Sequence, residues 1–168
     1  EAFYNMLQYY FSLAKRRNLL NDSTIVVLPE YLGTWLVVAN EKRSIYADTS
    51  LEDGMKTLVF SNIIKFGRAY LNATAKDKTK EAVFNMKAYK MAEIYQKVFS
   101  RLAKEYHITI VAGSIVLPDP SVKNGKLVIN KSGKLYNVSA VFDANGNILS
   151  PLTKKIFPIT EELSFTCA

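Results

Sequence analysis

The stretch 108-ITIVAGSIVL-117 is a continuous apolar run that ends at the turn residues 118-PDP-120. Such a run is typical of a strand that is buried on both faces. Ahead of it, apolar residues recur at helical spacing from Phe84 to Tyr106, which predicts a long helix. A second short run, 25-IVVL-28, predicts another buried strand earlier in the chain. A helix between two such strands indicates a βαβ unit, so the sequence predicts an α/β fold in which the two runs are neighbouring interior strands.

The same helical spacing of apolar residues predicts two shorter helices. The residues that mark the first are Phe3, Met6, Tyr10 and Leu13, and those that mark the second are Leu58, Ile63, Phe66 and Tyr70. Towards the C-terminus, 126-KLVIN-130, 135-LYNVSAVFD-143 and 148-ILSPLTKKIF-157 alternate with turn residues. One of these turns contains Asn145-Gly146, and Asn-Gly is the strongest short hairpin signal. We therefore predict an antiparallel meander over 126–157, next to the α/β core.

Composition limits the class of protein. The 168 residues are 49% hydrophobic, enough for one globular domain that spans 1–168, and no apolar run is long enough for a membrane span. One cysteine and one histidine exclude an internal disulfide and a zinc site of the usual ligands, whereas carboxylate sites for harder metals stay open. We expect no metal or cofactor, and a reducing, cytoplasmic location. The net charge of +7 is spread along the chain, which favours a solvated basic surface over a nucleic-acid-binding module, the alternative for this charge.

The segment 24-TIVVLPEYLGTW-35 places a carboxylate directly behind a predicted buried strand. An unpaired carboxylate in such a position is unfavourable unless it is hydrogen-bonded, paired or protonated. Glu30 is therefore a candidate functional residue. The aromatic residues Tyr31 and Trp35 could shape a pocket beside it, although such residues more often simply pack.

The order of several motifs resembles the nitrilase, or carbon-nitrogen hydrolase, superfamily. The motifs are LPEYLGTW, a strand that ends in Gly113-Ser114, the segment 136-YNVSAVFDANGNIL-149, and 153-TKKIFPITEE-162. The resemblance covers most of residues 3–166, whereas 39–80 matches no part of the family and is interpreted as an enlarged helical insertion. It implies a four-layer α-β-β-α sandwich, a homo-oligomer, and a small amide or nitrile as substrate, with no nucleic acid and no membrane.

Carried over residue by residue, the resemblance implies three catalytic residues. Glu30 matches the general base of the family, and Lys155 matches the lysine that stabilises the developing tetrahedral intermediate. Lys154 is the rival for that role because it is only one residue away. Glu162 matches a second glutamate that many members have near the site. A base and a cation of this kind suit hydrolysis through a thioester, which also needs a thiolate.

The nucleophilic cysteine of the family is not found at its usual place. It lies a few tens of residues beyond the lysine, whereas Cys167 follows Lys155 by only a short segment and matches the preceding loop. The family's first strand, ahead of the first helix, is missing too. We therefore interpret the chain as trimmed at both ends, and expect it to be inactive alone and active as the full-length protein.

Alternatives remain for the whole chain and for single residues. The chain could be a noncatalytic nitrilase-like interaction domain, or an acyltransferase of the same superfamily that passes the thioester to an amine. His107 could form a triad with Ser114 or Cys167, but a histidine between a helix and a strand is usually solvated or capping. Asn137 is as well suited to a strand ladder as to a substrate contact.

Overall fold

The computed structural model describes residues 1–41 and 51–167, and it has a mixed α/β fold, as the sequence predicts. No helix among the described residues is long and apolar enough to cross a membrane. In chain order the elements are α1 (Ala2–Arg16), β1 (Ile25–Val27), the 3-10 helix η1 (Thr34–Val38), α3 (Leu51–Ser61), α4 (Ile63–Leu71), α5 (Lys78–Tyr106), β2 (Thr109–Val111), β3 (Ile115–Pro118), β4 (Ser121–Lys123), β5 (Lys126–Val128), β6 (Leu135–Ser139), β7 (Val141–Phe142), β8 (Thr153–Lys154) and the 3-10 helix η2 (Glu162–Ser164).

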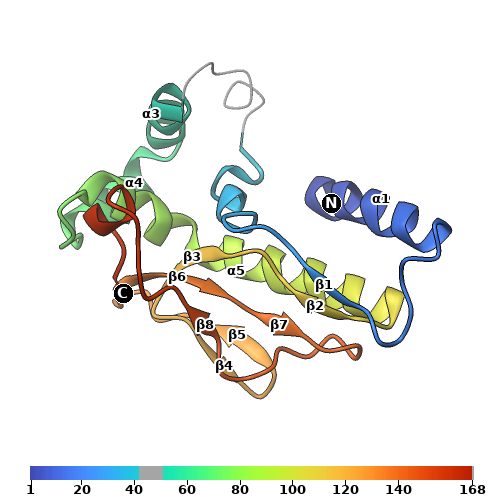
Figure 1. Ribbon diagram of the computed structural model, residues 1–168. Helices are drawn as coiled ribbons and strands as arrows, with labels where there is room; N and C mark the ends of the chain where they lie inside the picture. The colour runs from blue at the N-terminus through green and yellow to red at the C-terminus, as the bar shows by residue number, and fades with distance from the viewer. Residues whose placement is uncertain (42–50, 168) are drawn as a thin grey trace.

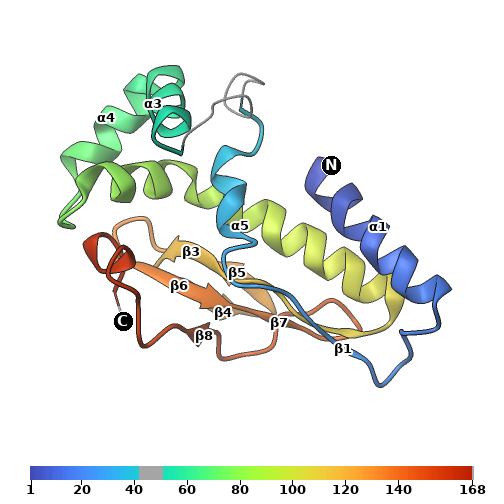
Figure 2. The ribbon, with the colours of Figure 1, turned by 45° about the horizontal axis from the view of Figure 1, so that its top comes forward.

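Within the described residues, six of the strands form two three-stranded sheets that continue into each other, and β4 and β5 form a separate two-stranded sheet. One sheet has the order β1-β2-β7, with β1 parallel to β2, and the other has the order β3-β6-β8, which is antiparallel throughout. Because β2 leads into β3 and β6 into β7, the backbone bond from Ala112 N to Ala140 O joins the two sheets. Figures 1 and 2 show the strands running on from one sheet to the other as one twisted layer, with α1 and α5 over one face.

The predicted pairing of 25–28 with 108–116 is confirmed for Ile25–Val27 with Thr109–Val111. The run predicted as one strand is, however, divided into β2 and β3, and β3 lies in the other sheet. Nor is β1 the predicted interior strand. Within the described part of the chain β1 is an edge strand, and Ile25 and Val27 are 62% and 70% exposed. The apolar run predicted burial on both faces because continuous β-branched residues carry no alternation from which a solvent face could be recognised.

The long helix α5 forms the core as predicted. Its N-terminus is capped by the Asp77 side chain, which accepts a hydrogen bond from Lys80 N. At its C-terminus His107 adopts a left-handed conformation, with φ at 53°, and its side chain is exposed. The buried stripe that faces the sheet includes Ala88, Met91, Tyr95, Val98 and Leu102.

The N-terminal helix α1 exists as predicted, but the apolar residues that marked it are not its most buried ones. Met6 and Tyr10 are exposed, whereas Tyr4, Leu7 and Phe11 are buried. Two apolar stripes, offset by one residue, overlap on this helix, so spacing alone cannot choose between them. Helix α5 decides the choice, because the Tyr4 hydroxyl donates to Glu105 at 2.5 Å and the Arg101 guanidinium lies 3.8 Å from the Tyr4 ring centroid.

The second predicted helix is divided into two. Asn62 lies between α3 and α4, and its side-chain amide donates to Leu58 O. This local bond from a side chain to the backbone competes with the regular hydrogen bonds of a continuous helix. Of the residues that marked this helix, Leu58 is buried while Ile63 and Tyr70 are exposed. The rest of the predicted insertion at 39–80 is only partly covered, since residues 42–50 lie outside the described residues.

The predicted meander is correct for 135–157 and wrong for 126–130. Strand β5 pairs with β4 in a separate hairpin rather than with β6, and β6 pairs with β3 and β8. The signal for the missed hairpin is Asn124-Gly125, where both residues have positive φ. The same dipeptide at Asn145-Gly146 does turn the chain as predicted, with Phe142 bridged to Ile148.

Candidate active site

Charged side chains from distant parts of the chain meet beside β6. The Lys155 ammonium lies 2.8 Å from Glu30 Oε1 and 2.6 Å from Glu162 Oε2. Glu30 follows β1, Lys155 follows β8, and Glu162 begins η2, so three separate segments supply the cluster. The predicted convergence of Glu30 and Lys155, which are 125 positions apart, is therefore present in the structure.

The structure also shows which of Lys154 and Lys155 belongs to the cluster. Lys154 pairs with Val138 across the β6–β8 ladder, and its ammonium lies 3.9 Å from the Tyr136 ring centroid. Side chains alternate between the two faces of a sheet, so Lys155 takes the opposite face, which it shares with Asn137. The backbone bond from Lys155 N to Asn137 O fixes this register.

The loop that carries Glu30 is fastened to the segment between β2 and β3. Tyr31 N donates to Ser114 Oγ and Gly33 N donates to Ser114 O, both at 2.9 Å. Gly113 is needed for this approach, because a Cβ placed there would lie 2.3 Å from Pro29 O. The Gly113-Ser114 interruption of the apolar run therefore positions the catalytic candidate Glu30.

Replacing Gly113 by alanine is expected to destabilise the protein by roughly 1–3 kcal/mol, since the added methyl overlaps Pro29 and Leu32 and the loop must move. The measurement is the free energy of unfolding in urea. Gly67→Ala is the matched control, because its methyl would meet no atom within 4 Å and lies inside helix α4, so we expect a gain of roughly 0.5–1 kcal/mol. A Gly113→Ala protein as stable as the parent would contradict the close approach.

Glu162 is the buried member of the cluster, with 1% of its surface exposed. Asn137 Nδ2 donates to its Oε1 at 2.8 Å, the Tyr31 hydroxyl donates to the same oxygen, and Ile159 N donates to Oε2 at 2.8 Å. Burial alone would raise the pKa of Glu162, but the hydrogen bonds, above all that of Lys155, outweigh it and hold the pKa at about 2. Glu162 is therefore a carboxylate whenever the protein is folded near neutral pH.

This depressed pKa predicts a specific acid sensitivity. The stability that Glu162 contributes is complete above its ordinary pKa of 4.5 and is lost as pH falls through about 2, a loss of roughly 3 kcal/mol. Urea unfolding between pH 2 and pH 7 should show this slope, and Glu162→Gln should flatten it. Glu93→Gln is the control: Lys90 lowers the pKa of Glu93 too, but in an exposed pair, so the slope should barely change. An unchanged slope in Glu162→Gln would refute the assignment.

Two polar partners in this cluster were not assigned to it by the sequence. Asn137 is 2% exposed, and its Nδ2 donates to Glu30 Oε1 at 2.9 Å and also to Glu162 Oε1. Tyr31 contacts Glu162 through its hydroxyl, so it does more than pack. Neither contact has a local signal in the sequence, because the partners lie 107 and 131 positions apart.

The remaining candidates lie elsewhere. Cys167 forms an isolated parallel β-bridge with Tyr136, and its backbone N–H donates to Leu135 O. The Cys167 side chain therefore lies on the same face of the sheet as Tyr136, opposite to Asn137 and Lys155. Exposed His107 caps α5 and has no contact with Ser114 or Cys167 among the interactions of the described residues. Trp35, in η1, is 61% exposed.

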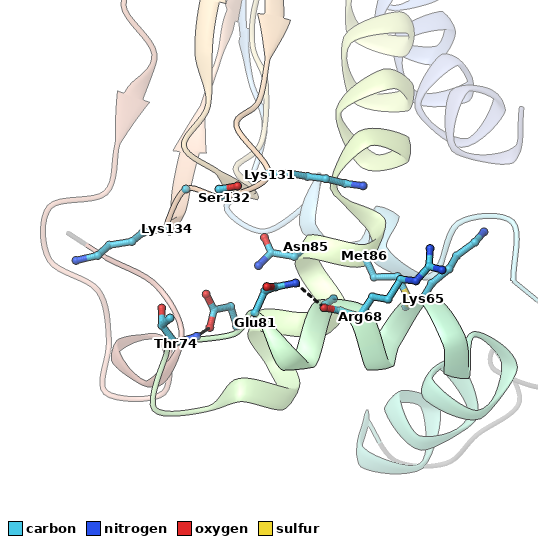
Figure 3. Close-up of a pocket in the computed structure, with 12 residues that line it drawn as sticks. Lys65, Arg68, Thr74, Glu81, Asn85, Met86, Lys131, Ser132 and Lys134 are labelled. Carbon is cyan, nitrogen blue, oxygen red and sulfur yellow. Dashed lines mark hydrogen bonds between the residues drawn. The ribbon is translucent and has the colours of Figure 1, made fainter.

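A cavity of about 630 Å³ lies between α4, the start of α5 and the loop after β5. Buried Glu81 lines it, with Oε2 bonded to Thr74 N and Ala75 N at 2.6 Å each. Figure 3 shows that the basic side chains around it diverge: Lys131 and Lys134 leave the loop in opposite directions. The cavity contains none of the cluster residues Glu30, Asn137, Lys155 and Glu162.

No group of three or more His, Cys, Asp or Glu side chains within 1–41 and 51–167 is arranged to hold a metal ion. The two carboxylates of the cluster are instead bound to one lysine. No family model, curated protein or solved structure matches the chain. We therefore infer the function from the geometry of this cluster alone.

Proposed function

We propose that this protein hydrolyses non-peptide carbon-nitrogen bonds, with a small amide or nitrile as substrate. The observation that carries the proposal is the position of the Lys155 ammonium between two carboxylates of different exposure. The Glu30 side chain is 50% exposed, whereas that of Glu162 is 2% exposed. Glu30 can therefore exchange protons with a substrate or a thiol, while Glu162 stays fixed behind the lysine.

The hydrogen bonds within the cluster leave one oxygen of Glu30 and one N–H donor of Lys155 available to a substrate. Lys155 and Asn137 both bind Oε1 of Glu30, and among the described residues no partner binds Oε2. Glu30 lies behind a strand that was predicted to be buried, but the exposure of its side chain leaves this oxygen open to an incoming group. Hydrogen bonds to Glu162 and Glu30 raise the pKa of Lys155, so it remains charged. Two of its three N–H donors are occupied, and the third can bind a developing oxyanion.

For an amide, the proposed reaction proceeds through a thioester. Glu30 takes the proton of a cysteine thiol, and the sulfur attacks the carbonyl carbon while the carbonyl electron pair moves to an oxygen that accepts a bond from Lys155. The intermediate expels the amine, which leaves with the proton held by Glu30. Water then attacks the thioester and gives a proton to Glu30, which returns it to the sulfur as the acid leaves.

We propose that the thiol belongs to a cysteine outside residues 1–168. Cys167 shares a face with Tyr136, on the side of the sheet opposite to Lys155, so its sulfur would have to cross the sheet to meet Glu30. A free thiol nucleophile also suits a reducing compartment, and we therefore propose a cytoplasmic protein.

We also propose that the layer of strands belongs to a nitrilase-type four-layer sandwich in a homo-oligomer. Helices α1 and α5 lie over one face of the strands, as one α-β half of such a sandwich requires (Figure 2). Ile25 and Val27 on β1 are exposed, so this α-β half has an apolar surface that another part of the sandwich could cover.

The test is release of ammonia from small amides and nitriles by the full-length gene product and by residues 1–168 alone. We expect activity in the first and none in the second, because the base and the cation act only as a unit with the nucleophile. Cys167→Ala should leave the full-length activity unchanged. Activity of residues 1–168 that disappears with Cys167→Ala would show that Cys167 is the nucleophile, and no activity in either protein would overturn the proposed function.

A further inference from the structure

We propose that Tyr31 is a positioning residue of this site, which holds Glu162 against Lys155 and fixes the adjacent Glu30 through its backbone. The inference rests on the proposed function for its catalytic meaning, but its structural part can be tested without any activity. It concerns a residue for which the sequence suggested only pocket-shaping or packing.

The side chain of Tyr31 contacts both charged partners of the buried ion pair. Its hydroxyl donates to Glu162 Oε1, the oxygen that also accepts from Asn137. The Lys155 ammonium lies 5.9 Å from the Tyr31 ring centroid, within the range of a cation–π interaction. Oxygen Oε1 is therefore occupied by neutral donors, which directs Oε2 of Glu162 towards Lys155.

The hydroxyl can do this over the whole physiological pH range. Burial, followed by the hydrogen bond to Glu162, raises the pKa of Tyr31 above its ordinary value of 10.0, which is itself well above neutral. The charged groups around the Tyr31 hydroxyl are the carboxylates of Glu162, Glu30 and Glu161, each of which raises its pKa, and the ammonium of Lys155, which contacts both Glu162 and Glu30. A phenol next to these carboxylates is thus a permanent donor, not a proton carrier.

The backbone of Tyr31 is held in an unusual conformation. Its φ is 65°, in the left-handed region that a bulky residue rarely adopts, so the surroundings must impose it. Its N–H donates to Ser114 Oγ at 2.9 Å, and its carbonyl accepts from Thr34 N at 2.9 Å. Because Glu30 is the preceding residue, these bonds also fix the direction in which Glu30 leaves the loop.

The test compares Tyr31→Phe with Tyr4→Phe. Tyr4 is a matched control because its hydroxyl also donates to a glutamate, Glu105, but on the α1–α5 interface. The first measurement is the pKa of Glu162 from the ¹³C shift of its carboxyl carbon in residues 1–168. Tyr31→Phe removes a donor from the charged form, so this pKa should rise, while Tyr4→Phe should leave it unchanged. The second is the kinetics of the full-length product, where we expect kcat to fall roughly tenfold to a hundredfold in Tyr31→Phe with little change in KM.

The outcomes are distinct. An unchanged Glu162 pKa in Tyr31→Phe overturns the inference, and so does a raised pKa with parental kcat. If the full-length parent shows no hydrolysis, the proposed function fails, and the pKa alone decides whether Tyr31 positions Glu162. Should Tyr31→Phe not fold, the parent protein is decisive: the Tyr31 hydroxyl proton must show a nuclear Overhauser contact to the Asn137 amide, since both donate to one oxygen, and its absence refutes the contact.

Discussion

Replacing Lys155 by methionine is expected to lower kcat of the full-length protein by roughly a hundredfold to a thousandfold. The substitution keeps most of the side-chain volume and removes the only cation between Glu30 and Glu162 among the described residues. It also leaves the buried Glu162 without its counter-ion, so the free energy of unfolding should fall by roughly 3 kcal/mol. Ammonia release and urea unfolding measure the two effects.

Lys154→Met is the matched control for this experiment. It removes the same charge one residue away, but its ammonium lies over the Tyr136 ring on the other face of the strand. Such an exposed cation–π interaction contributes only about 0.5–1 kcal/mol, and Lys154 does not contact either carboxylate of the cluster. Equal losses of activity in the two variants would contradict the assignment of Lys155.

Glu30→Gln is expected to lower kcat by roughly a hundredfold to ten-thousandfold while stability changes little. Glutamine keeps an oxygen that can accept the bonds from Lys155 and Asn137, and the side chain is half exposed, so the fold loses little. It cannot, however, take a proton from a thiol or from water. The measurements are single-turnover kinetics and urea unfolding of the same preparation.

The exposed neighbour Glu161 supplies the control for this second prediction. Glu161→Gln removes one negative charge close to the cluster without touching Lys155 in any described interaction. Its kcat should stay near that of the parent. A Glu30→Gln protein with parental kcat would show that Glu30 only holds Lys155 and is not the base.

The sequence was sufficient to predict those features that have a local pattern. The stripe from Ala88 to Leu102 predicted α5, and the runs at 25–28 and 108–116 predicted the parallel pair. Lys155 could be preferred over Lys154 only by the motif, whereas the structure separates them by strand alternation. Patterns of period 2 and 3.6 thus identify elements, but they do not determine which face of an element is used.

What sequence reasoning missed depends on partners that are distant in the chain. The buried face of α1 is chosen by Arg101 and Glu105 on α5, and no spacing within α1 contains that information. The role of Tyr31 follows from a contact with Glu162 that is 131 positions away. The β4–β5 hairpin is different: Asn124-Gly125 carried the signal, and it could have been predicted.

The most direct test of the proposed mechanism is mass spectrometry of the full-length protein, quenched in acid during turnover of a small amide. The mechanism predicts an acyl group on one cysteine outside residues 1–168, and predicts that Glu30→Gln and Lys155→Met form this adduct far more slowly than the parent. Hydrolysis that proceeds without any cysteine adduct, or an adduct on Cys167, would contradict it.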